Sequence, residues 1–202
     1  MDITWHGNTC VTIKGKNAAV VINPDKSIKS PLKGKVILSS LGEDQELAEV
    51  KEASKIFDWP GEYEVAEIPM IGLTAWTRSR SKEEEGGEKG EKTIIFCLEV
   101  DKVKICHLGG LGHKLTSEMV DEIGDVDVLC VPVGDAGNLS GKAEEVIDQI
   151  DPRIILLMGN GDPAANAKEI GAKLEESLDK LTIASTSALP EDKTLYYSLR
   201  KV

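Results

Sequence analysis

The grouping of short strand-like segments along this sequence restricts its fold more than any other feature. Residues 3–6, 10–14 and 18–23 are β-branched or alternating segments, and glycine and asparagine, which tolerate turn geometry, stand between them. Three such segments within the first 23 residues predict an antiparallel arrangement. Further strand-like segments, of which the first is a compact apolar run typical of a buried strand, follow at residues 36–39, 56–57, 63–68 and 71–76.

The second half of the chain opens with a hairpin and then changes its pattern. The segments 93–100 and 103–107 are joined by Asp101 and Lys102, a connection short enough for an antiparallel hairpin. Predicted helices and predicted strands then alternate. The helices are expected at 116–123, 140–150 and after residue 162, and the strands at 126–133, 153–158, 182–185 and 195–199.

The last predicted helix has a clear start signal. Asp162 stands at the position of an N-cap, and Pro163 follows at the first helical position. An apolar stripe at i, i+4 spacing then runs through Ile170, Leu174 and Leu178. Because helix capping accounts for Asp162, we do not count it as a metal ligand.

Strands that bury one face and carry helices on the other predict two sheets packed face to face with helices outside. The expected fold class is therefore α/β, a four-layer αββα sandwich. At 202 residues and 41% hydrophobic content, the chain can bury one substantial core, so we expect a single domain over residues 1–202.

Two polar segments interrupt this pattern. Residues 79–92 read SRSKEEEGGEKGEK without one apolar residue, so they have nothing to bury in return for being ordered. We expect a solvated, mobile hairpin tip there, with a charged docking loop as the functional alternative. The stretch 42–51 is also polar and is compatible with a short helix.

The charge of the chain excludes some classes of partner. A net charge of −11 and a pI near 4.8 argue against nucleic acid, whose binding depends on clustered Lys and Arg. Apolar runs such as 128–133 and 154–158 are much shorter than the roughly 20 residues of a membrane span. The N-terminus shows no basic and apolar signal segment, so we expect a cytoplasmic protein that binds neither nucleic acid nor membranes.

Cysteine and histidine are both scarce. The four cysteines form no C-x-x-C pair and each lies in an apolar stretch, which favours core positions over metal binding or disulfides. The histidines number three, namely His6, His107 and His113.

Three motifs point to one family. Residues 58–65 read DWPGEYEV, residues 106–116 read CHLGGLGHKLT, and residues 126–134 read VDVLCVPVG. Together with ITWHGNTCVTI and VVINP near the N-terminus, they make the chain resemble the metallo-β-lactamase superfamily. Within that superfamily the motifs are similar to the small metal-dependent hydrolases related to L-ascorbate-6-phosphate lactonase.

The resemblance implies an αββα sandwich with two metal ions between the sheet ends. A metal-bound hydroxide there would attack a lactone, amide or phosphoester, and this requires imidazole and carboxylate ligands. The family signature His-x-His-x-Asp-His falls on residues 40–45, where only Asp44 matches. The remaining ligand positions of the resemblance carry other residues, namely Asn8, Asn23, Ser40, Gly42, Gln45, Thr77, Gly110 and Gly159.

An alignment shift of a residue or two cannot supply the missing ligands, because no histidine lies between His6 and His107 or after His113. We therefore expect no metal, no cofactor and no catalytic residue, but a remnant cleft that binds a ligand. The candidate binding residues of this cleft are Asp44, Asp58, Glu62, Thr77, His107, Gly110, His113 and Asn160.

Each candidate also has a structural interpretation. A turn fixed by proline and glycine accounts for most of residues 58–63. His107 and His113 can make structural hydrogen bonds, although an acid/base arrangement of these histidines with Cys106 or Ser40 is an alternative. The glycines of residues 109–112 suit a tight turn, and their backbone N–H groups could also face an anion.

Three functions remain open. The leading hypothesis is a non-catalytic protein of the metallo-β-lactamase fold, a pseudoenzyme that binds a small molecule or protein or assembles as a homo-oligomer. The alternative is a hydrolase with an atypical Zn or Mn site built from Asp44, Glu43, His107 or His113. The third is a sensor of small anions or nucleotides at residues 109–112.

Overall fold

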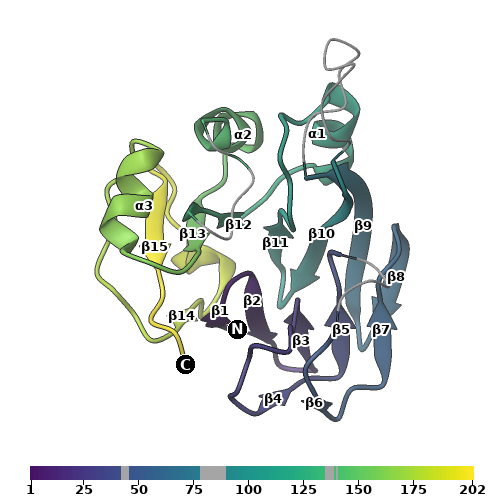
Figure 1. The fold of residues 1–202 in the computed structure, drawn as a ribbon. Helices are drawn as coiled ribbons and strands as arrows, with labels where there is room; N and C mark the ends of the chain where they lie inside the picture. Colours follow the sequence, from purple (N-terminus) through teal and green to yellow (C-terminus); the bar gives the residue numbers. More distant parts are fainter. Residues whose placement is uncertain (42–45, 78–89, 135–138, 140) are drawn as a thin grey trace.

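The computed structural model describes residues 1–41, 46–77, 90–134, 139 and 141–202, and these residues form two β-sheets that share one core (Figure 1). The first sheet has six strands, in the order β14 (Leu181–Thr182), β1 (Asp2–Gly7), β2 (Cys10–Lys14), β3 (Ala19–Ile22), β5 (Val36–Leu38) and β7 (Lys55–Phe57). The second has seven, in the order β15 (Leu195–Ser198), β13 (Ile154–Met158), β12 (Val128–Pro132), β11 (Val103–His107), β10 (Lys92–Val100), β9 (Ile68–Trp76) and β8 (Gly61–Val65).

Both sheets mix antiparallel and parallel pairing, and the antiparallel pairing predicted for the first three strands and for the hairpin of residues 93–107 is confirmed. β1, β2 and β3 are antiparallel neighbours, and so are β8, β9, β10 and β11. The strands that alternate with helices in the sequence, β11, β12, β13 and β15, pair in parallel. Parallel strands bring their carboxyl ends to one edge of the sheet.

The two faces of the seven-stranded sheet contribute side chains to two different hydrophobic clusters. In β10, the side chains of Ile94, Phe96 and Leu98 are buried between the sheets. Ile95 and Cys97 point the other way, into the cluster beneath the helices. Successive side chains of a strand point to opposite faces, so one apolar run serves both layers.

The helices cover the outer face of the seven-stranded sheet, as the α/β sandwich prediction requires (Figure 1). Val146, Ile147 and Ile150 form the buried stripe of the second helix. The predicted α/β class with two sheets packed face to face is confirmed. The buried residues of the three α-helices that the structure describes all belong to the cluster outside the seven-stranded sheet, so helices form the outer layer on this side. The helices are α1 (Ser117–Ile123), α2 (Ala143–Ile150) and α3 (Pro163–Glu169), followed by the short 3-10 helix η4 (Thr186–Ala188).

On the other side of the sandwich, an extended segment packs against the six-stranded sheet. Its strands β4 (Leu32–Lys33) and β6 (Val50–Lys51) form a two-stranded parallel ribbon. Leu32 and Val50 from this ribbon are buried with Val21 of β3. Residues 46–51 are therefore extended, whereas the sequence was compatible with a helix there.

The third helix is shorter than predicted. Asp162 caps it as expected, since its Oδ1 accepts a hydrogen bond of 3.1 Å from the Ala164 N–H. The helix ends before Gly171, whose φ of +66° is left-handed and stops the helical path. Leu174 and Leu178 instead form isolated bridges to Tyr196 and Leu199, so the predicted helical stripe is wrong beyond Ile170.

The segment predicted as one strand over residues 63–68 is a hairpin. Ala66 and Glu67, with φ of +54° and +61°, make a two-residue turn between β8 and β9. Non-glycine residues adopt this conformation rarely, so composition gave no turn signal.

Most of the polar segment 79–92 lies outside the described residues. At its ends, Thr77 and Glu91 pair: the Thr77 N–H donates to the Glu91 carbonyl at 2.9 Å, and the Glu91 N–H donates to Thr77 Oγ1 at 2.9 Å. The longest helix described, α2, has eight residues, and no described helix is long and apolar enough to cross a membrane.

Candidate functional site

Polar residues gather where the carboxyl ends of strands from both sheets meet. Asn23 follows β3 and Ser40 follows β5, while His107 ends β11 and Asn160 follows β13. In α/β sheets this edge is where ligands bind. We call the group that joins the two sheets here the polar seam, comprising Asn8, Thr9, Asn23, Ser40, Thr93, His107, Gly110 and Asn160.

Asn23 fixes the end of β3 within the seam. Its φ of +50° is left-handed, a conformation that asparagine tolerates better than most residues. Its side-chain Oδ1 accepts a 2.7 Å hydrogen bond from the Ser40 N–H, and its Nδ2 donates to Thr9 Oγ1 at 3.0 Å. One buried amide therefore joins the β1–β2 turn to the end of β5.

His107 crosses from the seven-stranded to the six-stranded sheet. The Gly109 N–H donates to its Nδ1 at 3.1 Å, so Nε2 carries the proton and donates to the Thr9 carbonyl at 2.9 Å. The ring is fully buried, and burial lowers its pKa to about 4. A neutral ring with both nitrogens engaged has no lone pair left for a metal ion.

Thr93 and Ser40 form a second bridge between the sheets. The Ser40 carbonyl accepts hydrogen bonds from the Ile94 N–H at 2.8 Å and from Thr93 Oγ1 at 3.1 Å. The same Thr93 hydroxyl oxygen accepts a 2.9 Å bond from the Gly110 N–H. The seam thus closes through short side chains and backbone groups.

Close packing at this bridge leaves little room. A Cβ on Gly109 would come within 2.4 Å of the Ile94 carbonyl oxygen and 3.0 Å of Ser40 Oγ. Ser40 itself is fully buried, and its hydroxyl has no hydrogen-bond partner among the described residues.

Asn8 and Asn160 extend the seam toward the surface. Asn160 Nδ2 donates to Asn8 Oδ1 at 2.6 Å, and Asn8 Nδ2 donates to Asp25 Oδ2 at 3.0 Å. Burial alone would raise the pKa of Asp25, but hydrogen bonds from Ser27 and Asn8 outweigh it and lower that pKa below its ordinary value. The Asp25 carboxylate is thus held by amide and hydroxyl donors.

The candidate residues from the sequence are not all brought together. His107, Gly110 and Asn160 lie in the seam, whereas Thr77 lies in the hairpin beyond β9. Asp44 lies outside the described residues. Three further candidates lie elsewhere in the fold, namely Asp58, Glu62 and His113.

His113 has a structural contact of its own. Its Nε2 accepts a 3.2 Å hydrogen bond from the Trp76 N–H, and its Nδ1 donates to the Lys114 carbonyl at 2.7 Å. Cys106 is buried beneath the helices, on the face opposite His107, so the two cannot act as an acid/base pair.

The glycine-rich turn after His107 uses its N–H groups internally. The Leu111 N–H donates to the Leu108 carbonyl at 3.1 Å, and the Gly112 N–H donates to the Trp76 carbonyl at 2.9 Å. With the bonds of Gly109 and Gly110 already described, four successive N–H groups are engaged within the chain. This arrangement does not present them to an anion.

The donor set does not fit the metal ions that the resemblance implies. Among the residues that the structure describes, no three His, Cys, Asp or Glu side chains come together in a way that could hold an ion. His6 contacts Thr12 Oγ1 through Nε2 at 2.8 Å and Ser30 Oγ through Nδ1 at 3.5 Å, so its ring is engaged outside the seam. Amides, hydroxyls and glycine N–H groups stand at this edge instead.

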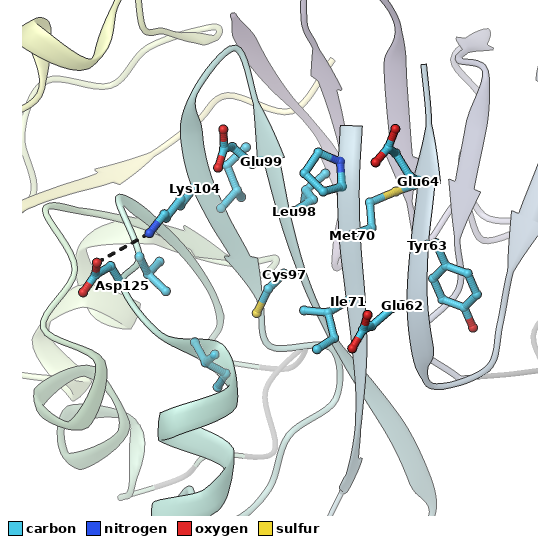
Figure 2. A pocket seen from close by; sticks show the side chains of 14 residues that line it. Glu62, Tyr63, Glu64, Met70, Ile71, Cys97, Leu98, Glu99, Lys104 and Asp125 are labelled. Atoms are coloured by element: carbon cyan, nitrogen blue, oxygen red, sulfur yellow. Dashed lines mark hydrogen bonds and ion pairs between the residues drawn. The ribbon is translucent and has the colours of Figure 1, made fainter. Parts of the chain in front are cut away.

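A cavity of about 570 Å³ lies elsewhere, on the outer face of β8 to β11 beside the end of α1 (Figure 2). This outer cavity has an apolar floor that includes Ile71 and the half-buried Cys97. Lys104 and Asp125 form an ion pair of 3.5 Å at its wall. Three further carboxylates line it, from Glu62, Glu64 and Glu99.

The sequence predicted some residues of the polar seam but not all of them. Asn8, Asn23 and Ser40 were singled out because ligands were expected there, but Thr9, Asp25 and Thr93 were not. Thr9 adjoins Asn8 in the same turn, and this adjacency is the signal that could have found it. Thr93 reads as an ordinary strand residue, since its partners lie 17 and 53 positions away.

Comparisons with known proteins agree with this architecture. A family model described as a beta-lactamase superfamily domain matches residues 2–159. A comparison with curated proteins gives no match.

Solved structures share the fold. A candidate Zn-dependent hydrolase of the metallo-beta-lactamase superfamily from Thermotoga maritima is 24% identical, with a TM-score of 0.74 over 99% of this chain and 100% of that one. A metallo hydrolase from Ignicoccus hospitalis is 15% identical, with a TM-score of 0.58 over 84% and 89% of the two chains. The metallo-beta-lactamase fold protein YhfI from Bacillus subtilis is 7% identical, with a TM-score of 0.57 over 99% and 96%.

Proposed function

We propose that this chain, which belongs to the beta-lactamase superfamily, is a non-catalytic member that acts as a binding or assembly module. The observation that carries the proposal is the polar seam. At the sheet edge where a hydrolase of this fold would hold metal, side chains of the seven-stranded sheet and its loops hydrogen-bond instead to the loops of the six-stranded sheet: His107 to the Thr9 carbonyl, Thr93 to the Ser40 carbonyl and Asn160 to the Asn8 side chain.

The chemistry of these side chains supports the proposal. A hydrolytic metal ion needs several ligands and one open position for water. His107 would have to break its bond with Thr9 or with Gly109 before it could bind an ion. Asn23 and Thr93 are neutral hydrogen-bonding groups that satisfy buried backbone atoms.

Metal analysis tests the proposal directly. The purified chain, before and after incubation with Zn²⁺, Mn²⁺ or Fe²⁺ and gel filtration, is expected to carry far less than one ion per chain by mass spectrometry. Its thermal unfolding midpoint should not respond to a chelator, because no ion stabilises the folded state. A tightly held, stoichiometric metal would overturn the proposal.

The second candidate function is a hydrolase with an atypical metal site, and the fold shared with the Thermotoga and Ignicoccus proteins favours it. Such a site would depend on Asp44. The Asp44→Ala variant then loses bound metal, while the control Asp192→Ala, at an exposed position far along the sequence, retains it. Under the non-catalytic proposal neither variant differs from the parent chain.

The assembly role has its own measurement. Light scattering coupled to gel filtration, across a concentration series, gives the mass of the particle in solution. A binding module without self-assembly remains at the chain mass of 21.8 kDa, and a homo-oligomer gives a multiple of it.

A further inference from the structure

Two of the four cysteines face each other across a hairpin. Cys97 of β10 and Cys106 of β11 are direct partners in the antiparallel register. They come from segments with no C-x-x-C spacing, so the sequence alone gives no sign of the pair.

The turn of this hairpin determines how close the two cysteines are. Asp101 and Lys102, with φ of +51° and +70°, form the two-residue turn, and Val100 and Val103 flank it. The pair that flanks such a turn is hydrogen-bonded, and hydrogen-bonded and non-hydrogen-bonded pairs then alternate along the ladder.

The cysteine pair lies three pairs beyond the one that flanks the turn, and is therefore a non-hydrogen-bonded pair. Cα atoms in such a pair are about 4.5 Å apart. This falls within the range of roughly 4.4–6.8 Å that disulfides span. Backbone separation therefore permits a bond between Cys97 and Cys106.

Both thiols point to the same face of the sheet. Cys106 is fully buried beneath the helices, and Cys97 is half-buried beside it. The neighbouring Cys97 thiol, together with burial, raises the pKa of the Cys106 thiol. Direct pairing in the register and a shared face of the sheet therefore place the two side chains next to each other before any bond forms.

Access differs between the two cysteines. Cys97 lines the outer cavity of about 570 Å³, next to Ile71 of β9 (Figure 2). Cys10 and Cys130 belong to two other buried clusters, under the ribbon and between the sheets. A small reagent in the cavity therefore meets Cys97 first.

We propose that Cys97 and Cys106 are a redox-active dithiol, which a low-molecular-weight disulfide entering the outer cavity converts to a cross-strand disulfide. This goes beyond the proposed function and does not depend on it. It assigns a modification site to a cavity wall that carries a thiol.

The exchange proceeds in two balanced steps. Cys97 loses its proton to water, and its thiolate attacks one sulfur of the disulfide reagent; a mixed disulfide forms and one reagent thiolate leaves. Cys106 then loses its proton to water and its thiolate attacks Cys97 Sγ, so that the protein disulfide forms and the second reagent thiolate leaves; the two reagent thiolates take up the two protons. The two cysteines are oxidised by two electrons, and the reagent disulfide is reduced to two thiols.

The test uses the reduced, full-length chain in buffers of oxidised and reduced glutathione at increasing ratio. After alkylation of the remaining thiols, peptide mass spectrometry is expected to show the loss of two thiols from the parent chain and a cross-link between the Cys97 and Cys106 peptides. Dithiothreitol should restore both thiols. Absence of this cross-link in the folded chain at every ratio would overturn the proposal, as would a stable glutathione adduct on Cys97 in the parent chain.

Two variants separate the steps. In Cys106→Ala the mixed disulfide cannot be resolved, so Cys97 should retain one glutathione. In Cys97→Ser the attacking thiol is missing, and no glutathione should be incorporated at Cys106. The control Cys10→Ala, which alters a cysteine of another cluster, should form the cross-link as the parent chain does, and circular dichroism establishes that each variant is folded.

Discussion

The polar seam lies where the strand ends of the two sheets meet, whereas the outer cavity lies on the outer face of the seven-stranded sheet, and the two use their polar groups in different ways. At the seam, the side chains of Asn23, Thr93 and His107 form hydrogen bonds with backbone groups in the loops of the six-stranded sheet. At the cavity, the carboxylates of Glu62 and Glu64 line a hollow open to solvent. At the edge where the resemblance places the metal ions, the described polar groups are engaged in hydrogen bonds, and an open concave surface lies elsewhere.

The seam and the cavity should therefore contribute differently to the stability of the fold. A buried group whose partner is removed leaves another polar atom unsatisfied, which costs about 1–3 kcal/mol, whereas exposed charges contribute little. Substitutions in the seam should therefore lower stability, and those at the cavity should leave it nearly unchanged. The predictions below test this contrast, beginning with the largest expected effect.

Gly109→Ala should be the most damaging change in the seam. The new Cβ would approach the Ile94 carbonyl oxygen to 2.4 Å at a φ of +59°. Left-handed strain and overpacking together should lower the free energy of unfolding by about 3 kcal/mol, measured by urea titration.

Gly171→Ala is the matched control. Gly171, after the end of α3, has a similar φ of +66°, but nothing lies within 4 Å of its Cβ position. This variant should lose only about 1 kcal/mol, from backbone strain alone. Equal losses at the two glycines would contradict the close packing of the seam.

The titration of His107 gives the next largest effect. Burial holds its pKa at about 4 in the folded chain, below the roughly 6.5 of an exposed histidine, so protonation favours the unfolded state. Its contribution to stability is complete above pH 6.5 and is lost as the pH falls from 6.5 toward 4. Between pH 7 and pH 5 the loss should be about 2 kcal/mol.

His107→Gln isolates this contribution, because glutamine keeps an amide donor for the Thr9 carbonyl and does not titrate. Unfolding free energies of both proteins at pH 7 and pH 5 give two slopes, and carboxylates and His6 affect both alike. The variant should lack the part of the slope that His107 supplies. Parallel slopes would show that His107 is solvated or protonated in the folded chain.

The strands and hairpins of this fold follow from local sequence, but one stripe shows where local reasoning fails. Leu174 and Leu178 are four residues apart, which places them on one face of a helix and equally on one face of a strand. The left-handed Gly171 decides between the two, because it ends the helix before either leucine. Spacing alone favoured the wrong element.

The seam was predictable only in part, for a different reason. Its location follows from the resemblance, which places the expected ligands at Asn8, Asn23, Ser40 and Gly110. Its closure depends on contacts between distant residues, such as Thr9 with His107, 98 positions apart, and Asn8 with Asn160, 152 positions apart. Such pairs are set by the order of strands in two sheets, which no local pattern reports.

Thr93→Val tests the bridge between the sheets with a change of equal size. Valine keeps the volume of Thr93 but leaves the Gly110 N–H and the Ser40 carbonyl without this hydroxyl, so stability should fall by about 1.5 kcal/mol in urea titrations. Thr74→Val is the control, since Thr74 lies exposed on the neighbouring strand β9 and should change stability by less than about 0.5 kcal/mol. Equal effects at both threonines would remove the distinction between seam and surface.

The smallest effect is expected at the wall of the outer cavity. Asp125→Asn removes the ion pair with Lys104. The Asp125 side chain is 97% exposed and the Lys104 side chain is 49% exposed. Exposed pairs gain little in water and are screened by salt, so the unfolding free energy should stay within about 0.5 kcal/mol of the parent value. The measurement is a pair of urea titrations at low and high salt. A larger loss, present at low salt and absent at high salt, would mean that charge at the cavity contributes to the stability of the fold. The seam and the cavity would then both stabilise the fold, and they would differ only in using neutral hydrogen bonds and charge, respectively.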